Sequence, residues 1–99
     1  AIENDSRSFL AYYNRGLVRM VMKDPRGAVE DYTRVIQLNP RHFLSYANRG
    51  NMLRSIGNFR AAIADFEKAL EVAPANWRYR KMVERNLARA RKKLAASGK

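Results

Sequence analysis

The sequence predicts an all-α fold, an α-solenoid of two antiparallel helix pairs with a fifth helix that caps one end. The first observation is an internal repeat, because a shift of 34 residues aligns residues 9–42 with residues 43–76 at ten identical positions. The second is that apolar residues within each repeat follow helical spacing, with Pro or Gly between the two helical stretches. The identical pairs are Phe9/Phe43, Leu10/Leu44, Tyr12/Tyr46, Asn14/Asn48, Arg15/Arg49, Gly16/Gly50, Arg26/Arg60, Ala28/Ala62, Asp31/Asp65 and Pro40/Pro74.

Length and composition exclude several classes of protein. The 99 residues are 46% hydrophobic and 29% charged, which predicts one folded domain over residues 1–99 and excludes a multidomain enzyme. The lack of cysteine excludes disulfides and thiolate zinc sites, and it leaves the compartment open, with the cytoplasm favoured. The longest apolar stretch, around residues 17–22, is interrupted by Arg19 and is too short to span a bilayer.

The first residues lack a secretory-signal pattern, and we interpret the chain as a segment of a longer protein.

The first helix pair begins with a helix over about residues 7–23. Asp24 then caps the second helix, and Pro25 suits its first turn, where a missing N–H has no partner to lose. This second helix runs to about residue 38, and the dipeptide Asn39-Pro40 ends the pair.

The second helix pair repeats this plan with different turn residues. Its first helix spans about residues 43–56 and is closed by Gly57, which tolerates the left-handed terminating conformation. Asn58 caps the helix over residues 59–72, and Ala73-Pro74 ends the pair.

The fifth helix is predicted to follow Asn76 as its cap and to run to about Ala96. An apolar stripe on this helix predicts that it docks on the second pair. The stripe consists of Tyr79, Val83, Leu87, Ala90 and Leu94.

Small and aromatic residues predict how the helices of a pair pack. Gly16 and Gly50 are expected to face Ala28 and Ala62, because only small side chains let two helix axes approach closely. The aromatic residues are interpreted as core or inter-helix packing rather than as a cofactor site, and they are Tyr12, Tyr32, Tyr46, Phe59 and Phe66.

These residues resemble the tetratricopeptide repeat, a 34-residue helix-turn-helix unit. The second unit matches its signature at Tyr46, Gly50, Leu53, Gly57, Phe59, Ala62, Ile63, Phe66, Ala69, Leu70 and Pro74. The first unit matches at Tyr12, Gly16, Ala28, Val29, Tyr32, Ile36 and Pro40. The departures are Arg49 at a usual Leu, Arg19 at an apolar position, and Lys23 and Pro25 in the turn. The resemblance implies a right-handed superhelix with repeats over residues 9–42 and 43–76 and a capping helix over about 77–96.

Residue patterns for catalysis are weak, and no enzyme activity, cofactor or metal is expected. His42 is the sole histidine, and we interpret it as a surface-loop residue without a nucleophile or metal partner at a recognisable spacing. The five glycines are scattered singly and form no phosphate loop. The acidic residues of the second helices are interpreted as solvated faces, and they are Glu30, Asp31, Asp65, Glu67 and Glu71.

The net charge of +11 is concentrated in the last helix. Residues 1–42 carry +2, residues 43–76 carry +1, and residues 77–99 carry +8. A basic stripe beside the apolar one consists of Arg78, Lys81, Arg85, Arg89 and Lys92. Two interpretations stay open: a solvated outer face of a capping helix, or a site for an acidic ligand.

The resemblance implies that the first helices of the pairs line a concave groove for a peptide or helix of a protein partner. The leading hypothesis is a non-catalytic interaction module that binds an acidic or amphipathic segment there. The groove residues would be Tyr13, Asn14, Leu17 and Met20 from the first unit, Asn48, Asn51 and Arg54 from the second, and Arg78, Lys81, Arg85 and Arg89 from the last helix. In chaperone-binding members, Lys and Asn residues hold a C-terminal carboxylate, and only Asn48 and Arg78 offer similar groups here.

Two further functions are weighed. Nucleic acid or another anionic surface could bind the basic last helix, with Trp77 and Tyr79 as stacking groups. Homotypic assembly could cover the apolar face that the first helix exposes. We expect a monomer, because the net charge of +11 opposes association.

Overall fold

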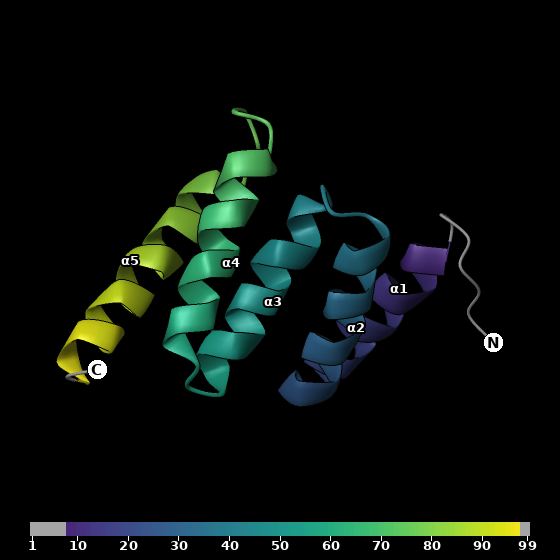
Figure 1. The fold of residues 1–99 in the computed structure, drawn as a ribbon, viewed down its shortest axis with the longest axis horizontal. Coiled ribbons are helices and arrows are strands. Elements are labelled where there is room, and N and C mark those ends of the chain that lie inside the picture. The colour runs from purple at the N-terminus through teal and green to yellow at the C-terminus, as the bar shows by residue number, and fades with distance from the viewer. Residues whose placement is uncertain (1–7, 98–99) are drawn as a thin grey trace.

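A computed structural model describes residues 8–97, which form five α-helices arranged one after another across the molecule (Figure 1). The helices are α1 (Ser8–Val21), α2 (Pro25–Leu38), α3 (Phe43–Ser55), α4 (Phe59–Val72) and α5 (Arg80–Ala96). α1 packs on α2, α3 packs on α4, and α2 joins the two pairs by packing on α3. α5 packs mainly on α4, and α1 and α5 lie at opposite ends of the row. The predicted all-α solenoid with a capping helix is confirmed.

The caps predicted within the helix pairs are confirmed. The Asp24 side chain accepts a hydrogen bond from the backbone N–H of Gly27 at 3.1 Å, and Pro25 occupies the first position of α2. The Asn58 side chain accepts from the backbone N–H of Ala61 at 3.3 Å at the start of α4. Both caps satisfy a donor that the first helical turn leaves without a partner.

The turns inside the two pairs have the same backbone path despite their different residues. Gly57 has a φ of +87°, as predicted, and Lys23, at the matching position, has a φ of +62°. Because Lys23 leaves helical geometry, α1 ends at Val21, two residues earlier than expected, and α3 likewise ends at Ser55 rather than Ile56. The predicted start of the first helix at Arg7 lies outside the described residues.

The predicted start of the fifth helix is wrong, because α5 begins at Arg80 and not directly after Asn76. The chain first makes two successive turns, in which the N–H of Trp77 bonds to the Pro74 carbonyl and the N–H of Arg80 to the Trp77 carbonyl, both at 3.1 Å. The Arg80 guanidinium donates to the carbonyls of Leu70, Ala73 and Pro74, so it caps the end of α4. These interactions hold the chain against α4 before helical geometry resumes.

The apolar stripe predicted for the fifth helix is confirmed in its centre. Val83, Leu87 and Ala90 are buried in the core that α5 shares with α3 and α4. Tyr79 precedes the helix and is 45% exposed, and Leu94 is only partly buried. Burial of these three apolar side chains holds α5 on the second pair.

The close approach of the helices within each pair is real, but the closest neighbours of the glycines are aromatic rings. A Cβ added at Gly16 would lie 2.9 Å from Cε1 of Tyr32, and one added at Gly50 would lie 2.7 Å from Cε1 of Phe66. The expectation that these glycines chiefly face Ala28 and Ala62 is therefore corrected. Both rings are fully buried, so they cannot move aside, and Gly is needed at both positions.

Candidate functional site

A groove of about 310 Å³ lies between α1, α3 and the chain that enters α5. Its walls are mostly apolar and aromatic, with two asparagine side chains on the α3 wall. The lining residues are Tyr13, Leu17, Met20, Leu44, Ala47, Asn48, Asn51, Trp77, Tyr79, Met82 and Val83.

The structure brings together the predicted groove residues Tyr13, Leu17, Met20, Asn48 and Asn51. Leu44 and Ala47 also line the groove and were missed, although each lies four residues, about one helical turn, before Asn48 and Asn51 respectively. The groove residues contributed by the chain before α5 and by its first turn were also missed, and they are Trp77, Tyr79, Met82 and Val83.

Polar groups in the groove are held by neighbouring contacts. Nδ2 of Asn86 donates a hydrogen bond to Oδ1 of Asn51 at 3.1 Å, which ties α5 to α3 directly. The Tyr13 ring packs at 6.0 Å from the Tyr32 ring, and burial raises the pKa of Tyr13, partly offset by the Asn48 side chain. The Tyr13 phenol therefore stays neutral and acts as a hydrogen-bonding group at physiological pH.

Arg54 and Arg89 come together in a different place, a neighbouring hollow of about 510 Å³. This basic hollow lies between the end of α3, the start of α4 and the C-terminal half of α5. Its lining residues are Arg54, Phe59, Arg89, Lys92, Lys93 and Ala96. The sequence predicted one groove for Arg54, Arg89 and the apolar residues, whereas the structure divides them between an apolar groove and a neighbouring basic hollow.

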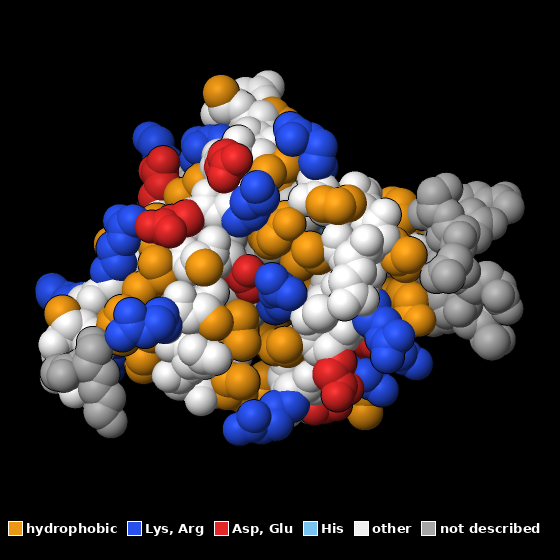
Figure 2. Space-filling view, in the orientation of Figure 1, with side chains coloured by type: hydrophobic (Ala, Val, Ile, Leu, Met, Phe, Trp, Pro, Cys, Tyr) orange, Lys and Arg blue, Asp and Glu red, His pale blue; other side chains and the backbone are white. Residues whose placement is uncertain are grey.

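Four other predicted groove residues do not line the groove, and all four are exposed. Lys81 and Arg85 lie on α5, and Figure 2 shows Lys and Arg side chains following this helix along the edge of the molecule. Arg78 precedes α5, and its guanidinium carbon lies 5.3 Å from the centre of the Tyr79 ring. Asn14 lies on α1.

The family comparison agrees with this geometry. A family model described as the tetratricopeptide repeat matches residues 9–42 and again residues 43–76. The chain belongs to the tetratricopeptide repeat family. No curated protein matches the chain at a significant level. Tetratricopeptide repeats indicate a protein–protein interaction module, and the family is generally a non-catalytic scaffold.

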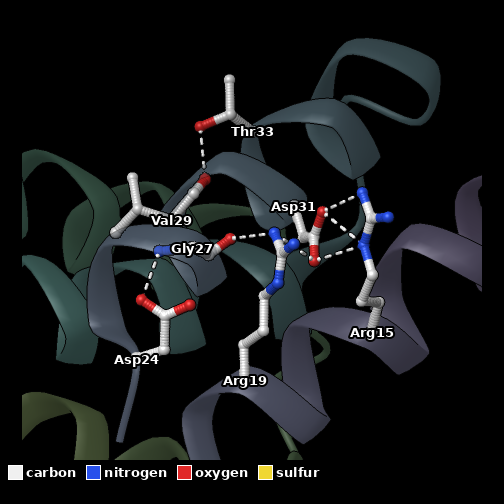
Figure 3. A network of polar contacts seen from close by, with 7 residues as sticks. All are labelled: Arg15, Arg19, Asp24, Gly27, Val29, Asp31 and Thr33. Atoms are coloured by element: carbon white, nitrogen blue, oxygen red, sulfur yellow. Dashed lines mark hydrogen bonds and ion pairs between the residues drawn. The ribbon is translucent and has the colours of Figure 1, made fainter.

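Each tetratricopeptide repeat contains an Arg–Asp ion pair, and this corrects the interpretation of Asp31 and Asp65 as solvated. Nη2 of Arg15 lies 2.9 Å from Oδ1 of Asp31, and Nε of Arg49 lies 2.7 Å from Oδ2 of Asp65. Both carboxylates are buried, with Asp31 1% and Asp65 5% exposed. Buried carboxylates need such partners because desolvation of a charge is costly. Figure 3 shows Arg15 and Arg19 of α1 both pointing at Asp31 of α2.

Arg49, which departs from the family pattern, also joins the two tetratricopeptide repeats. Its Nη1 donates to Oγ1 of Thr33 on α2 at 3.1 Å, while its other nitrogens bind Asp65 on α4. A leucine at this position could pack between the helices but could not make these three bonds. The arginine therefore links three helices through one planar group.

His42 lies in the loop between α2 and α3, as interpreted, but it is partly buried there and not free on the surface. Its Nδ1 accepts the backbone N–H of Ser45 at 3.3 Å, so the ring caps α3. The ring packs edge-on against Phe9 and Tyr13 of α1, with centroids 5.4 and 4.9 Å apart. Burial lowers the pKa of His42 below its ordinary value. His42 therefore helps to join the repeats and is not a free base.

No helix within residues 8–97 is long and apolar enough to cross a membrane.

Proposed function

We propose that this tetratricopeptide repeat chain is a non-catalytic interaction module that binds an acidic or amphipathic segment of a protein partner in its groove. The observation that carries the proposal is the groove itself, which combines apolar walls with side-chain amides. Apolar side chains of a peptide gain free energy when they leave water in such a groove. Side-chain amides such as those of Asn48 and Asn51 can both donate to and accept from a peptide backbone.

The charge of the chain supports a partner with acidic residues beside its apolar ones. Residues 77–99 carry nine basic residues and one acidic residue. Lys81 and Arg85 are exposed on α5, the helix that contributes Met82 and Val83 to the groove. They would speed the encounter with an acidic segment and orient it, although exposed charges contribute little affinity individually.

We also propose that the chain has no enzyme activity. The polar groups that line the groove are amides and phenols, which lack the nucleophile and general base that hydrolysis or transfer reactions need. His42, the sole histidine, uses its Nδ1 as a helix cap.

A calorimetric titration with a capped peptide, a Leu-Phe anchor followed by three Glu residues, tests the proposal. We expect Leu17→Gln to weaken binding strongly, because it removes an apolar wall of the groove. We expect Lys81→Glu/Arg85→Glu to weaken binding as well, with helicity by circular dichroism unchanged. The matched control is Arg26→Glu/Arg41→Glu, which changes the net charge equally at exposed positions on other elements. Affinity that none of the variants alters would refute the groove as the binding site.

Contacts around the predicted stacking groups favour protein over nucleic acid. The Trp77 ring packs on Phe43 with centroids 5.0 Å apart, and the Arg78 guanidinium lies over the Tyr79 ring. Each ring therefore already has a neighbour within the protein, which leaves less of its surface free for a base to stack on. Retardation of single-stranded DNA at low salt, with a steep loss as salt rises, would instead support a nucleic-acid role.

A further inference from the structure

We infer that the basic hollow is a second binding site, which takes a carboxylate group carried beside an apolar side chain on the partner peptide. This inference rests on the proposed function and deepens it, because it assigns the acidic part of the partner to particular residues. It assigns the apolar anchor of the peptide to the groove and the carboxylates of the peptide to the basic hollow.

The lining of the basic hollow carries four positive charges and an apolar surface. Arg54 comes from the last turn of α3, and Arg89, Lys92 and Lys93 come from α5. None of the hollow's lining residues is acidic. Like charges around one cavity repel each other, so an anion that enters the hollow lowers the electrostatic free energy.

Arg54 provides the most specific indication of an anionic ligand. Its Nε is buried and has no hydrogen-bond partner among residues 8–97. A buried donor on a charged group is costly to leave without an acceptor, and a small rotation of the Arg54 side chain toward a carboxylate in the hollow would supply one. Arg80 is the other described residue with such an Nε, but its guanidinium already holds three carbonyls at the end of α4.

Arginines elsewhere in the chain show what this side chain does when a carboxylate is in reach. Arg15 and Arg49 bind Asp31 and Asp65, and Arg91 of α5 binds Glu67 of α4 at 2.6 Å. The four cations of the basic hollow have no ion pair within the described part of the chain, although Arg89 lies only two residues from Arg91. A carboxylate from another molecule could therefore pair with them without displacing a partner in this part of the chain.

The apolar part of the lining determines the class of ligand. Phe59, the first residue of α4, and Ala96, the last residue of α5, line the hollow beside the four cations. A small inorganic anion would leave this surface and most of the 510 Å³ unfilled. A glutamate or aspartate next to an apolar residue satisfies both the cations and the apolar surface.

The basic hollow continues the groove along the same two helices. Arg54 lies one turn beyond Asn51 on α3, and Arg89 lies one turn beyond Asn86 on α5. The hydrogen bond between Asn51 and Asn86 therefore lies at the boundary between the two sites. One extended peptide could place its anchor in the groove, cross this amide pair and place its acidic residues in the hollow.

A pair of labelled peptides tests the inference. Both carry two leucines and a short spacer, followed by Glu-Phe-Glu in one and Gln-Phe-Gln in the other. Fluorescence anisotropy should give at least about tenfold tighter binding of the Glu peptide to the unaltered chain, since charge-assisted hydrogen bonds form only with carboxylates. Arg89→Glu/Lys93→Glu should abolish this preference and Arg54→Gln should reduce it severalfold, while the control Arg26→Glu/Arg41→Glu retains it. Amide shifts of Phe59 and Ala96 on addition of the Glu peptide provide a readout that needs no variant.

The outcomes distinguish this inference from the proposed function. Equal binding of the two peptides overturns the inference and leaves the proposed function standing, whereas no binding of either peptide refutes both. Loss of the Glu preference in the control variant would show a general charge effect and would also overturn the inference. Displacement of the Glu peptide by a single-stranded DNA dodecamer, dependent on Arg89 and Lys93, would assign the hollow to nucleic acid instead.

Discussion

The two repeats contain the same Arg–Asp pair, sixteen residues apart, yet its surroundings differ. In the first repeat the Arg15 side chain is 51% exposed, and Arg19 shares its carboxylate partner. In the second repeat the Arg49 side chain is 21% exposed and also binds Thr33 of the preceding pair. Both carboxylates are buried, and the exposure of the arginine that binds each one differs according to whether another helix pair packs beside it.

The apolar residues at the C-terminal end of α1 are likewise more exposed than their counterparts in the second repeat. Val18 of α1 and Met22, just after it, are 54% and 72% exposed, whereas their counterparts Met52 of α3 and Ile56, just after it, are partly buried. Within the described residues, α3 packs against α2, α4 and α5, while α1 packs against α2 and forms one end of the row. Burial in a solenoid thus depends on a repeat's neighbour as well as on its own sequence.

The largest expected effect comes from breaking the ion pair of Arg49 and Asp65. Arg49→Met leaves the buried Asp65 carboxylate without its arginine, and we expect a loss of about 3–5 kcal/mol in the free energy of unfolding. Arg15→Met should cost less, because Asp31 keeps Arg19 at 3.3 Å and the arginine it loses is largely exposed. Urea denaturation followed by circular dichroism measures both.

A double variant controls for the loss of packing. Arg49→Met/Asp65→Leu removes both charges together, and it should recover most of the stability that Arg49→Met loses. Equal losses for Arg15→Met and Arg49→Met would contradict the view that the neighbouring repeat makes the two pairs different.

The turns within the two repeats allow a second comparison, for which we expect stability changes of intermediate size. Lys23→Gly should stabilise the chain by about 0.5–1 kcal/mol, because Lys23 has a left-handed backbone that a residue with a Cβ adopts at a cost. Gly57→Lys should destabilise it by about 1 kcal/mol for the same reason. An added Cβ at Gly57 meets no atom within 4 Å, so this loss is conformational and not steric. Thermal unfolding of the two variants should show melting-temperature shifts of opposite sign, and shifts of the same sign would refute this explanation.

The smallest expected effect concerns the N-caps of α3 and α4, because His42, the cap of α3, titrates and Asn58, the cap of α4, does not. Burial lowers the pKa of His42 below its ordinary 6.5, so the unfolded chain binds this proton more tightly than the folded chain. The contribution of His42 to stability is therefore fully present above about pH 6.5 and declines as pH falls through that value. Protonation also removes the Nδ1 acceptor that caps α3.

His42→Asn tests this effect, since it supplies the type of cap that Asn58 gives α4 and cannot titrate. The difference in unfolding free energy between the unaltered chain and the variant, measured in urea, should change between about pH 5 and about pH 8 in favour of the variant at the acidic end. A difference that does not vary with pH would count against the cap as a titrating contact.

The groove could be predicted only in part, because the sequence shows the phase of a helix but not its rotation against a neighbour. Tyr13, Leu17, Asn48 and Asn51 follow from helical spacing and the family resemblance. The rotation of α5 is set by the burial of Val83, Leu87 and Ala90. This packing brings Met82 and Val83 to the groove and leaves Lys81 and Arg85 out of its lining.

The burial of Asp31 and Asp65 was not predicted either, but in this case the sequence contained an indication of it. Each aspartate repeats together with an arginine sixteen residues earlier, and both members of the pair are identical in the two repeats. An acidic residue with a constant basic companion suggests an ion pair more than a solvated face.

The sequence by itself determined the repeat, the helix pairs and their caps at Asp24 and Asn58. These features arise from interactions between residues a few positions apart, or from a period that recurs along the chain. Only the tertiary structure decided which carboxylates are buried, and that Arg54 and Arg89 share a hollow apart from the groove. Such features depend on which surfaces of distant helices meet, and packing sets this after the helices have formed.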